Sequence, residues 1–311
     1  VLDMVEETLG VRCSNICRPL NSYINRVYEV QLDDLQSAVI PKFYRPGRWD
    51  RDALQDEHDF LLELDKAEVP VIPPLTNEAG ETLFDADGMY FAIFSKKGGR
   101  ICDEPTGDQW KELGRLLSRF HLVGAEREPR NRITMGPRES SADQVRYILE
   151  SDLVTMESRS AYEAALMETL ELIEPLFEES ERIRIHGDCH HQNIIYRPDE
   201  SFYLIDLDDM AMGPPIQDVW MLLPGRLEDS RREMDLFIEG YETFQEFDDQ
   251  CLKLIEPLRA MRYIHFTAWC AHQAADGGFT RLAPDWGSDS YWKRETHELK
   301  KQQVEIVDAL S

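Results

Sequence analysis

Residues 183–209 read IRIHGDCHHQNIIYRPDESFYLIDLDD, and this is the most informative stretch of the sequence. Two apolar runs, at 194–196 and 202–205, flank the turn-prone residues RPDES. Short apolar runs on either side of such a turn are typical of a β-hairpin. A turn centred on Asp199 and Glu200 would place Ile194 opposite Ile205.

This pairing predicts a metal site at one end of the hairpin. Asn193 would lie opposite Asp206, and directly paired residues have Cβ atoms about 5 Å apart. Amide and carboxylate oxygens are hard ligands that suit Mg²⁺, which takes one or two carboxylates together with substrate phosphates. Asp188 stands five residues before Asn193, after a glycine and in a segment too polar to continue a strand. We therefore expect Asp188 to face the same metal site from a loop.

Two other interpretations of this segment remain open. In the first, HGDCHHQN is a polar turn whose Asp and Asn side chains cap local backbone groups. In the second, the segment holds a transition metal, as in a metal-dependent hydrolase. The ligands would then come from His186, Asp188, Cys189, His190 and His191. Five potential ligands within six residues cannot all point at one ion, which disfavours this second interpretation.

The composition is that of a globular protein with a strongly acidic surface. The chain has 311 residues, 42% of them hydrophobic, and a formal net charge of −26. This charge repels phosphate backbones and anionic lipids, so we expect neither a nucleic-acid nor a membrane partner. No apolar stretch approaches the roughly 18 residues that span a bilayer, and the first ten residues lack a secretory signal pattern. We therefore expect a cytoplasmic protein with reduced cysteines.

Hydrophobic patterns divide the chain into a β-rich first part and a helical remainder. Strands are predicted at 25–32 (NRVYEVQL), 37–45 (SAVIPKFYR), 69–75 (VPVIPPL) and 88–94 (GMYFAIF), with one helix at 50–67. Further helices are predicted at 106–124, 141–180, 216–246, 251–275 and 290–309. This shift in pattern predicts two lobes.

Glu57 is out of place in the predicted helix 50–67. It falls on the apolar stripe marked by Leu54, Leu61 and Leu64. Because an unpaired buried carboxylate is strongly destabilising, we expect a cation on a neighbouring strand, and Lys42 is the candidate. The alternatives are a solvent-facing lysine and a frayed helix face. Pro41 cannot donate to a sheet ladder, which favours a bulge beside Lys42.

The segment 183–209 resembles the catalytic and metal-binding loops of the aminoglycoside-phosphotransferase-like kinases. Their pattern is HxDxxxxN followed by an IDxxD-type strand end, and this chain has HGDCHHQN and LIDLDD. The resemblance implies that Asp188 is the catalytic base and that Asn193 and Asp206 hold Mg²⁺. It also implies supporting roles for His186, which would brace the catalytic loop, and for Asp208, just beyond the metal ligands.

The same resemblance implies an α+β, bilobal protein-kinase-like fold. Residues 1–95 would form a small β-rich lobe that binds ATP, and residues 96–311 a larger helical lobe for catalysis and substrate. Lys42, steadied by Glu57, would hold the nucleotide phosphates. The phosphate-covering loop is not glycine-rich here, so its contacts would come from Ser22, Tyr23 and Asn25. The remaining implied site residues are Phe94 and Ser95, whose backbone would meet the adenine, and Asp218, which would brace the catalytic loop.

Across nearly its full length the chain is similar to the stress response kinase A family of bacterial serine/threonine protein kinases. The shared stretches include PLNSYINRVYEV, KFYRPGRW and GPPIQDVWMLL, besides the two motifs above. This resemblance implies phosphorylation of a protein hydroxyl from ATP, with autophosphorylation, in a stress response. Two alternatives stay open: a kinase of a small amino alcohol, amino acid or aminoglycoside, and a nucleotide-binding pseudokinase or interaction module.

Overall fold

The computed structural model describes residues 1–33, 37–198, 200–274 and 284–310, which form two compact units. The first unit comprises Val1–Arg132, Arg184–Met210 and Met221–Phe247. The second comprises Ile133–Ile183, Ala211–Trp220 and Asp248–Ser311. Asp199, on which the predicted turn is centred, and residue 275, which ends a predicted helix, lie outside the described residues. The lobe boundary after residue 95 stays a prediction.

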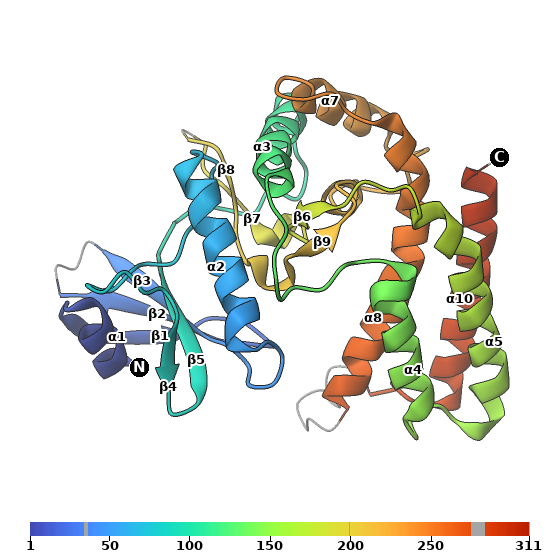
Figure 1. The fold of residues 1–311 in the computed structure, drawn as a ribbon, viewed down its shortest axis with the longest axis horizontal. Coiled ribbons are helices and arrows are strands. Elements are labelled where there is room, and N and C mark those ends of the chain that lie inside the picture. The colour runs from blue at the N-terminus through green and yellow to red at the C-terminus, as the bar shows by residue number, and fades with distance from the viewer. Residues whose placement is uncertain (34–36, 199, 275–283, 311) are drawn as a thin grey trace. The chain divides into compact units, whose positions relative to one another are not determined.

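The first unit is built on a five-stranded antiparallel sheet with the order β1-β2-β3-β5-β4 (Figure 1). Its strands are β1 (Cys13–Pro19), β2 (Arg26–Leu32), β3 (Ala38–Phe43), β4 (Phe84–Ala86) and β5 (Met89–Ser95). Strands β2, β3 and β5 confirm three of the predictions. Strands β1 and β4 were not predicted.

Two helices cover the two faces of this sheet, α1 (Leu2–Leu9) and α2 (Arg51–Lys66) (Figure 1). Val5 of α1 packs in one apolar cluster with Phe91, whereas Leu54 of α2 packs in another with Ala92. Successive side chains of a strand point to opposite faces. Because Lys42 pairs with Ala92 across β3 and β5, Lys42 lies on the face that α2 covers. Helix α2 confirms the predicted helix at 50–67.

Two expectations about the first unit are wrong. Pro41 lies in the interior strand β3 without a bulge, because the register to β2 and to β5 stays constant on both sides of it. The pairing between β2 and β3 skips position 41, so the missing N–H removes part of the ladder without shifting the register. Residues 69–75 do not form a strand, and contribute only single bridges at Val71 and Pro74. Three prolines in seven residues explain this.

The rest of the first unit contains Arg184–Met210, with the predicted hairpin and catalytic loop. Its elements are α3 (Gly107–Ala125), β6 (Ile183–Ile185, whose first residue belongs to the second unit), a 3₁₀ turn (His191–Asn193), β7 (Ile194–Tyr196), β8 (Phe202–Leu204), a second 3₁₀ turn (Leu207–Asp209) and α7 (Arg231–Tyr241). Strands β7 and β8 pair antiparallel, which confirms the predicted hairpin. Helices α3 and α7 pack closely, since a Cβ at Gly114 would overlap the Phe237 carbonyl oxygen.

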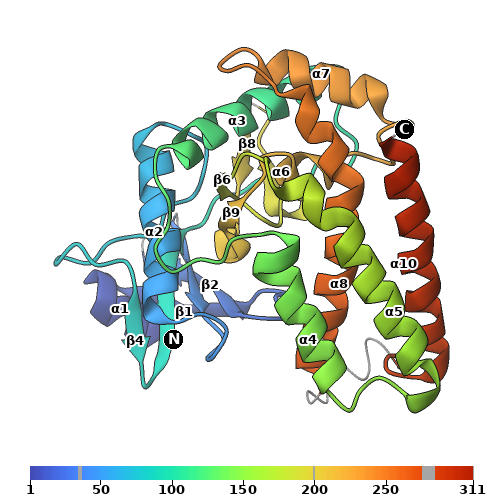
Figure 2. The same cartoon turned by 45° about the vertical axis from the view of Figure 1, so that its right-hand side comes forward.

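The second unit is mainly helical (Figure 2). Its elements are a π-helical turn (Pro137–Ser141), α4 (Ala142–Glu150), α5 (Met156–Ile173), 3₁₀ turns (Glu174–Phe177 and Asp249–Leu254), β9 (Ala211–Gly213), α6 (Gln217–Trp220), α8 (Ile255–Gln273) and α10 (Asp289–Ala309). Helix α10 packs against α5 and α8, and α4 packs against α8. Helix α10 confirms the prediction at 290–309, whereas the predictions at 141–180 and 216–246 each merge separate helices.

Two general properties of the described chain bear on the earlier expectations. All six cysteines are free thiols. Within the described ranges, no helix combines the length and the apolar character that crossing a bilayer requires.

Candidate active site

The loop HGDCHHQN is held against the hairpin by His186 and Gly187. The His186 ring Nδ1 accepts from the Asp188 backbone N–H at 3.4 Å, so its Nε2 carries the hydrogen that it donates to the Ile205 carbonyl at 2.9 Å. Gly187 has φ 83°, and a Cβ there would overlap the Asp209 carbonyl oxygen. The loop and the segment 207–209 therefore touch through backbone, with His186 bridging the loop to β8's end.

Asp188 is fixed by two neighbours from its own loop. Asn193 Nδ2 donates to the Asp188 carbonyl oxygen at 3.0 Å. The His190 ring Nδ1 accepts from the Gln192 backbone N–H at 3.2 Å, so the neutral ring carries its hydrogen on Nε2. That Nε2 lies 3.3 Å from Asp188 Oδ2. His190, which the sequence suggested only as a metal ligand, thus contacts the predicted catalytic carboxylate.

The predicted hairpin register is wrong by one residue. Ile194 pairs with Leu204 rather than with Ile205, and the Ile205 N–H donates to the Asn193 carbonyl at 3.0 Å. The cause is the connection from 197 to 201, which has an odd number of residues and so cannot be centred between two of them. Asp206 follows directly in the left-handed region (φ 61°, ψ 65°), which turns the chain out of the strand.

Asn193 and Asp206 offer a donor set that fits Mg²⁺. The Asp206 side chain is 50% exposed, and its Oδ1 accepts from Lys42 Nζ at 2.7 Å, which leaves Oδ2 without a protein partner in the described ranges. Asn193 uses Nδ2 for the loop, so its amide oxygen remains available. No group of three or more His, Cys, Asp or Glu side chains suited to a metal ion occurs among the described residues. Mg²⁺ is usually bound by a small number of protein ligands together with substrate phosphates.

Glu57 is buried as the sequence predicts, but its partner is Arg132 and not Lys42. Arg132 Nη2 lies 2.8 Å from Glu57 Oε2, and the two side chains are 0% and 1% exposed. Arg132 also donates from Nε to the Ala53 carbonyl at 2.8 Å and from Nη1 to the Asp208 carbonyl at 2.6 Å. Arg132 lies in a loop 75 residues beyond Glu57, where no periodicity in the sequence marks it as buried.

Lys42 instead pairs with the carboxylates that follow β8. Its Nζ lies 2.7 Å from Asp206 Oδ1 and 3.3 Å from Asp208 Oδ1. Burial alone would lower the pKa of Lys42, but Asp206, Asp208 and Glu57 outweigh it and hold this pKa well above its ordinary value. Lys42 is therefore a buried, protonated amine at the edge of the predicted metal site.

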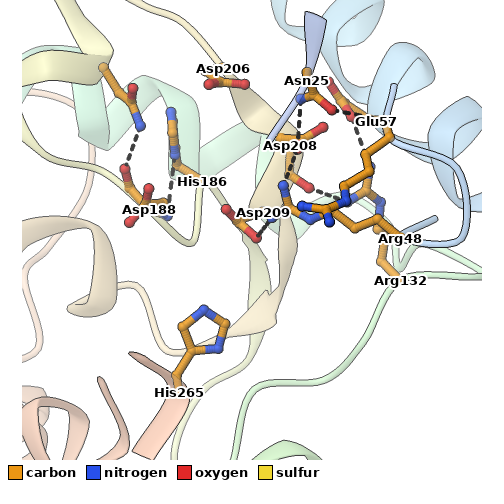
Figure 3. Close-up of polar contacts among 12 residues, drawn as sticks. Asn25, Arg48, Glu57, Arg132, His186, Asp188, Asp206, Asp208, Asp209 and His265 are labelled. Carbon is orange, nitrogen blue, oxygen red and sulfur yellow. Dashed lines mark hydrogen bonds and ion pairs between the residues drawn. The ribbon is translucent and has the colours of Figure 1, made fainter. Parts of the chain in front are cut away.

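The Asp208 carboxylate accepts hydrogen bonds from two segments of the first unit, around Asn25 and around Arg48 (Figure 3). Its Oδ2 accepts from Arg48 Nη1 at 2.5 Å and from Asn25 Nδ2 at 3.1 Å. Arg48 Nη2 also reaches Asp209 Oδ1 at 2.6 Å. Burial alone would raise the pKa of Asp208, but Lys42 and Arg48 reverse this and bring it to about 2. These partners keep Asp208 negatively charged at neutral pH.

A neutral histidine lies beside Lys42 on the α2 face. His58 Nε2 is 2.9 Å from the Tyr44 hydroxyl, and Nδ1 is 2.9 Å from Thr82 Oγ1. Burial, with Lys42 and Arg132 adding to it, lowers the pKa of His58 to about 3. The Lys42 ammonium lies 5.1 Å from the centre of the Tyr44 ring.

The other predicted site residues lie as follows. Ser22 and Tyr23 are exposed in the connection between β1 and β2, whereas the Asn25 amide is occupied inside the protein, bonding Asp208 and the Arg45 N–H. Phe94 and Ser95 end β5, half-buried and exposed respectively. Asp218 is fully buried in α6 of the second unit. Their assigned roles stay predictions.

Comparison with known proteins identifies the family. The profile of the phosphotransferase enzyme family matches residues 16–255, which include the whole constellation around Asp188, Asp206 and Lys42. The chain belongs to the phosphotransferase enzyme family. Stress response kinase A of Escherichia coli O157:H7 is 39% identical over 94% of this chain and 88% of its own length. Serine/threonine protein kinase RdoA of Salmonella typhimurium is 38% identical over the same shares.

Solved structures agree on the fold of this phosphotransferase. Amicoumacin kinase hAmiN, in complex with AMP-PNP and Ca²⁺, superposes with a TM-score of 0.75 at 20% identity, covering 99% of this chain and 92% of that one. A microcompartment-associated aminopropanol kinase gives 0.72 at 18% identity, covering 97% and 98%. The kinase-like α+β fold, and the assignment of the chain as a kinase related to stress response kinase A, are thereby confirmed.

Proposed function

We propose that this phosphotransferase is an ATP- and Mg²⁺-dependent serine/threonine protein kinase of a stress response, which also phosphorylates itself. The observation that carries the proposal is the position of Lys42, a buried ammonium 2.7 Å from the half-exposed carboxylate of Asp206. An ammonium beside a carboxylate with a free oxygen suits a triphosphate and its counter-ion. The two relatives at 38–39% identity, named as protein and stress response kinases, support a protein acceptor.

Each residue has a separate task in the proposed reaction. Asn193 and Asp206 would hold Mg²⁺, which supplies charge neutralisation on the β- and γ-phosphate oxygens. Lys42 binds the phosphates and fixes the nucleotide. Asp188 orients the acceptor hydroxyl and takes its proton as the hydroxyl oxygen bonds to the γ-phosphorus and the bond to the β–γ bridging oxygen breaks. ADP leaves with that oxygen, so atoms and charge balance.

Replacing Asp188 tests the chemistry. We expect Asp188→Ala to lower turnover by roughly 10²- to 10⁴-fold while ATP binding stays largely unchanged, because a positioned base acts on the acceptor and not on the nucleotide. Turnover would be followed with γ-labelled ATP and binding with a non-hydrolysable analogue. Turnover equal to that of the unaltered protein would remove Asp188 from the mechanism.

A small-molecule kinase is the second candidate, favoured by one observation. The net charge of −26 would attract cationic acceptors such as amino alcohols or aminoglycosides. Incubation with γ-labelled ATP, first alone and then with candidate proteins or amines, separates the two functions. Label on protein, including the chain itself, supports the protein kinase, and label confined to the amine supports the alternative.

A further inference from the structure

Lys42 has two carboxylate partners that differ greatly in exposure. Asp206 lies 2.7 Å from Nζ and its side chain is 50% exposed. Asp208 lies 3.3 Å from Nζ and its side chain is 5% exposed. Charges in water are screened and replaceable, whereas a buried pair keeps its geometry. Asp208 is thus the lasting partner of Lys42, whereas the contact of Lys42 with Asp206 can be replaced by solvent, by a cation that binds Asp206 or by a phosphate that binds Lys42.

One oxygen of Asp208 is left unsatisfied in this arrangement. Oδ2 accepts from Arg48 and Asn25, but Oδ1 accepts no hydrogen bond from any residue within the described ranges. A buried carboxylate oxygen without a donor is destabilising. Lys42 Nζ, 3.3 Å away, can satisfy it once the ammonium is drawn from Asp206. Lys42 can therefore keep its contact with Asp208 when its contact with Asp206 is lost.

The helix carboxylate cannot take this role. Glu57 forms its ion pair with Arg132, and both side chains are fully buried. Moving Lys42 to Glu57 would leave Arg132 unpaired in the interior, which is strongly unfavourable. In the described part of the chain, Asp206, Asp208 and no other carboxylate lie within 4 Å of Lys42 Nζ.

We propose that Asp208 is the positioning residue that holds Lys42 for the nucleotide phosphates, in place of the helix residue Glu57. The proposal rests on the proposed function, in which Lys42 binds those phosphates. Asp208 acts through Lys42 and does not touch the nucleotide. Arg48 and Asn25, which both bond Oδ2, fix the carboxylate so that Oδ1 faces Lys42.

Asp209 supplies a matched control on the neighbouring position. Asp208 and Asp209 each accept one hydrogen bond from Arg48, but among the described residues Asp208, and not Asp209, also forms an ion pair with Lys42. We expect Asp208→Asn to weaken binding of a magnesium-loaded, non-hydrolysable ATP analogue by about tenfold or more, and Asp209→Asn to change it by less than about threefold. Equal weakening in the two variants would overturn the assignment, because the loss would then stem from Arg48.

A double-mutant cycle shows whether Asp208 works through Lys42. Lys42→Met should weaken nucleotide binding, and Asp208→Asn should add no further loss in that background. Removing both charges together also avoids a lone buried charge, so the double variant tests the idea even if Asp208→Asn alone does not fold. Additive losses would overturn the proposal. Unchanged binding in Lys42→Met would instead refute the proposed function, so the two failures can be told apart.

Discussion

Replacing Arg132 by methionine tests the ion pair that joins α2 to the segment 207–209. The change removes the Arg132 bonds to Glu57, to the Ala53 carbonyl and to the Asp208 carbonyl, and leaves Glu57 buried without a cation. Breaking one side of a buried pair costs about 3–5 kcal/mol. We expect Arg132→Met to lower the free energy of unfolding by that amount at pH 8, measured by urea denaturation.

The double variant Arg132→Met/Glu57→Met separates the charge from the packing. Apolar side chains of similar volume often replace a buried ion pair without loss of stability. We therefore expect the double variant to regain most of the lost stability. Its kinase activity should stay low, because the Asp208 carbonyl still lacks the Arg132 donor that positions the segment. A double variant as unstable as Arg132→Met would refute the view that the stranded Glu57 charge causes the loss.

The pH dependence of Arg132→Met gives a further check. Burial raises the pKa of Glu57 to about 7, against the opposing effect of Lys42 and Arg132. Without Arg132 this pKa rises further. A carboxylate with a raised folded-state pKa contributes stability below its unfolded pKa and loses it as pH rises through the folded value. The destabilisation should therefore be smaller at pH 5 than at pH 8, and a loss that is equal at both pH values would contradict the argument.

Two histidines give the remaining predictions. The pKa of His58 is lowered from about 6.5 to about 3 in the folded protein, so the unfolded chain binds a proton at this ring at higher pH than the folded chain does. The stability that neutral His58 contributes is therefore present above pH 6.5 and is lost as the pH falls towards 3. We compare the unfolding free energy of the unaltered protein with that of His58→Gln. The difference between them should fall by roughly 2 kcal/mol from pH 7.5 to pH 5, and a constant difference would show that burial does not lower the pKa of His58. His190→Ala should lower turnover by about ten- to hundredfold with the KM for ATP unchanged, and His190→Gln, whose Nε2 can still reach Asp188, should keep more of it. Equal rates for the two His190 variants would mean that the donor to Asp188 is irrelevant.

Local patterns were sufficient where neighbouring residues determine the outcome. The hairpin at β7 and β8 follows from two apolar runs and a turn, and α2 follows from its apolar stripe. The position of Glu57 on an apolar stripe also correctly predicted that this carboxylate is buried beside a cation. Because a buried charge needs a partner in any fold, the presence of a cation beside Glu57 can be predicted from the sequence alone.

The identity of each partner required the tertiary structure. The cation for Glu57 comes from Arg132, in a loop distant along the chain, and Lys42 turns to carboxylates more than 160 residues away. Spacing within one helix and one strand carries no information about either contact. The prediction of the hairpin register was wrong for a different reason. Moving the centre of the turn by half a residue changes every pair of the hairpin, and the composition of RPDES does not determine where that centre lies.

Exposure separates the structural charges of this site from the functional ones. Glu57 and Arg132 are both fully buried, so a ligand cannot reach them and their pairing fixes α2 to the segment 207–209. Lys42 and Asp208 are also buried, but Lys42 further contacts Asp206, whose side chain is half exposed. A cation or phosphate entering at Asp206 therefore changes the pairing of Lys42 while Arg132 keeps the backbone of Asp208 in place. If Asp208 were as exposed as Asp206, Lys42 would have no fixed partner. Because Asp208 is buried, Lys42 stays charged and in position when a ligand replaces its contact with Asp206.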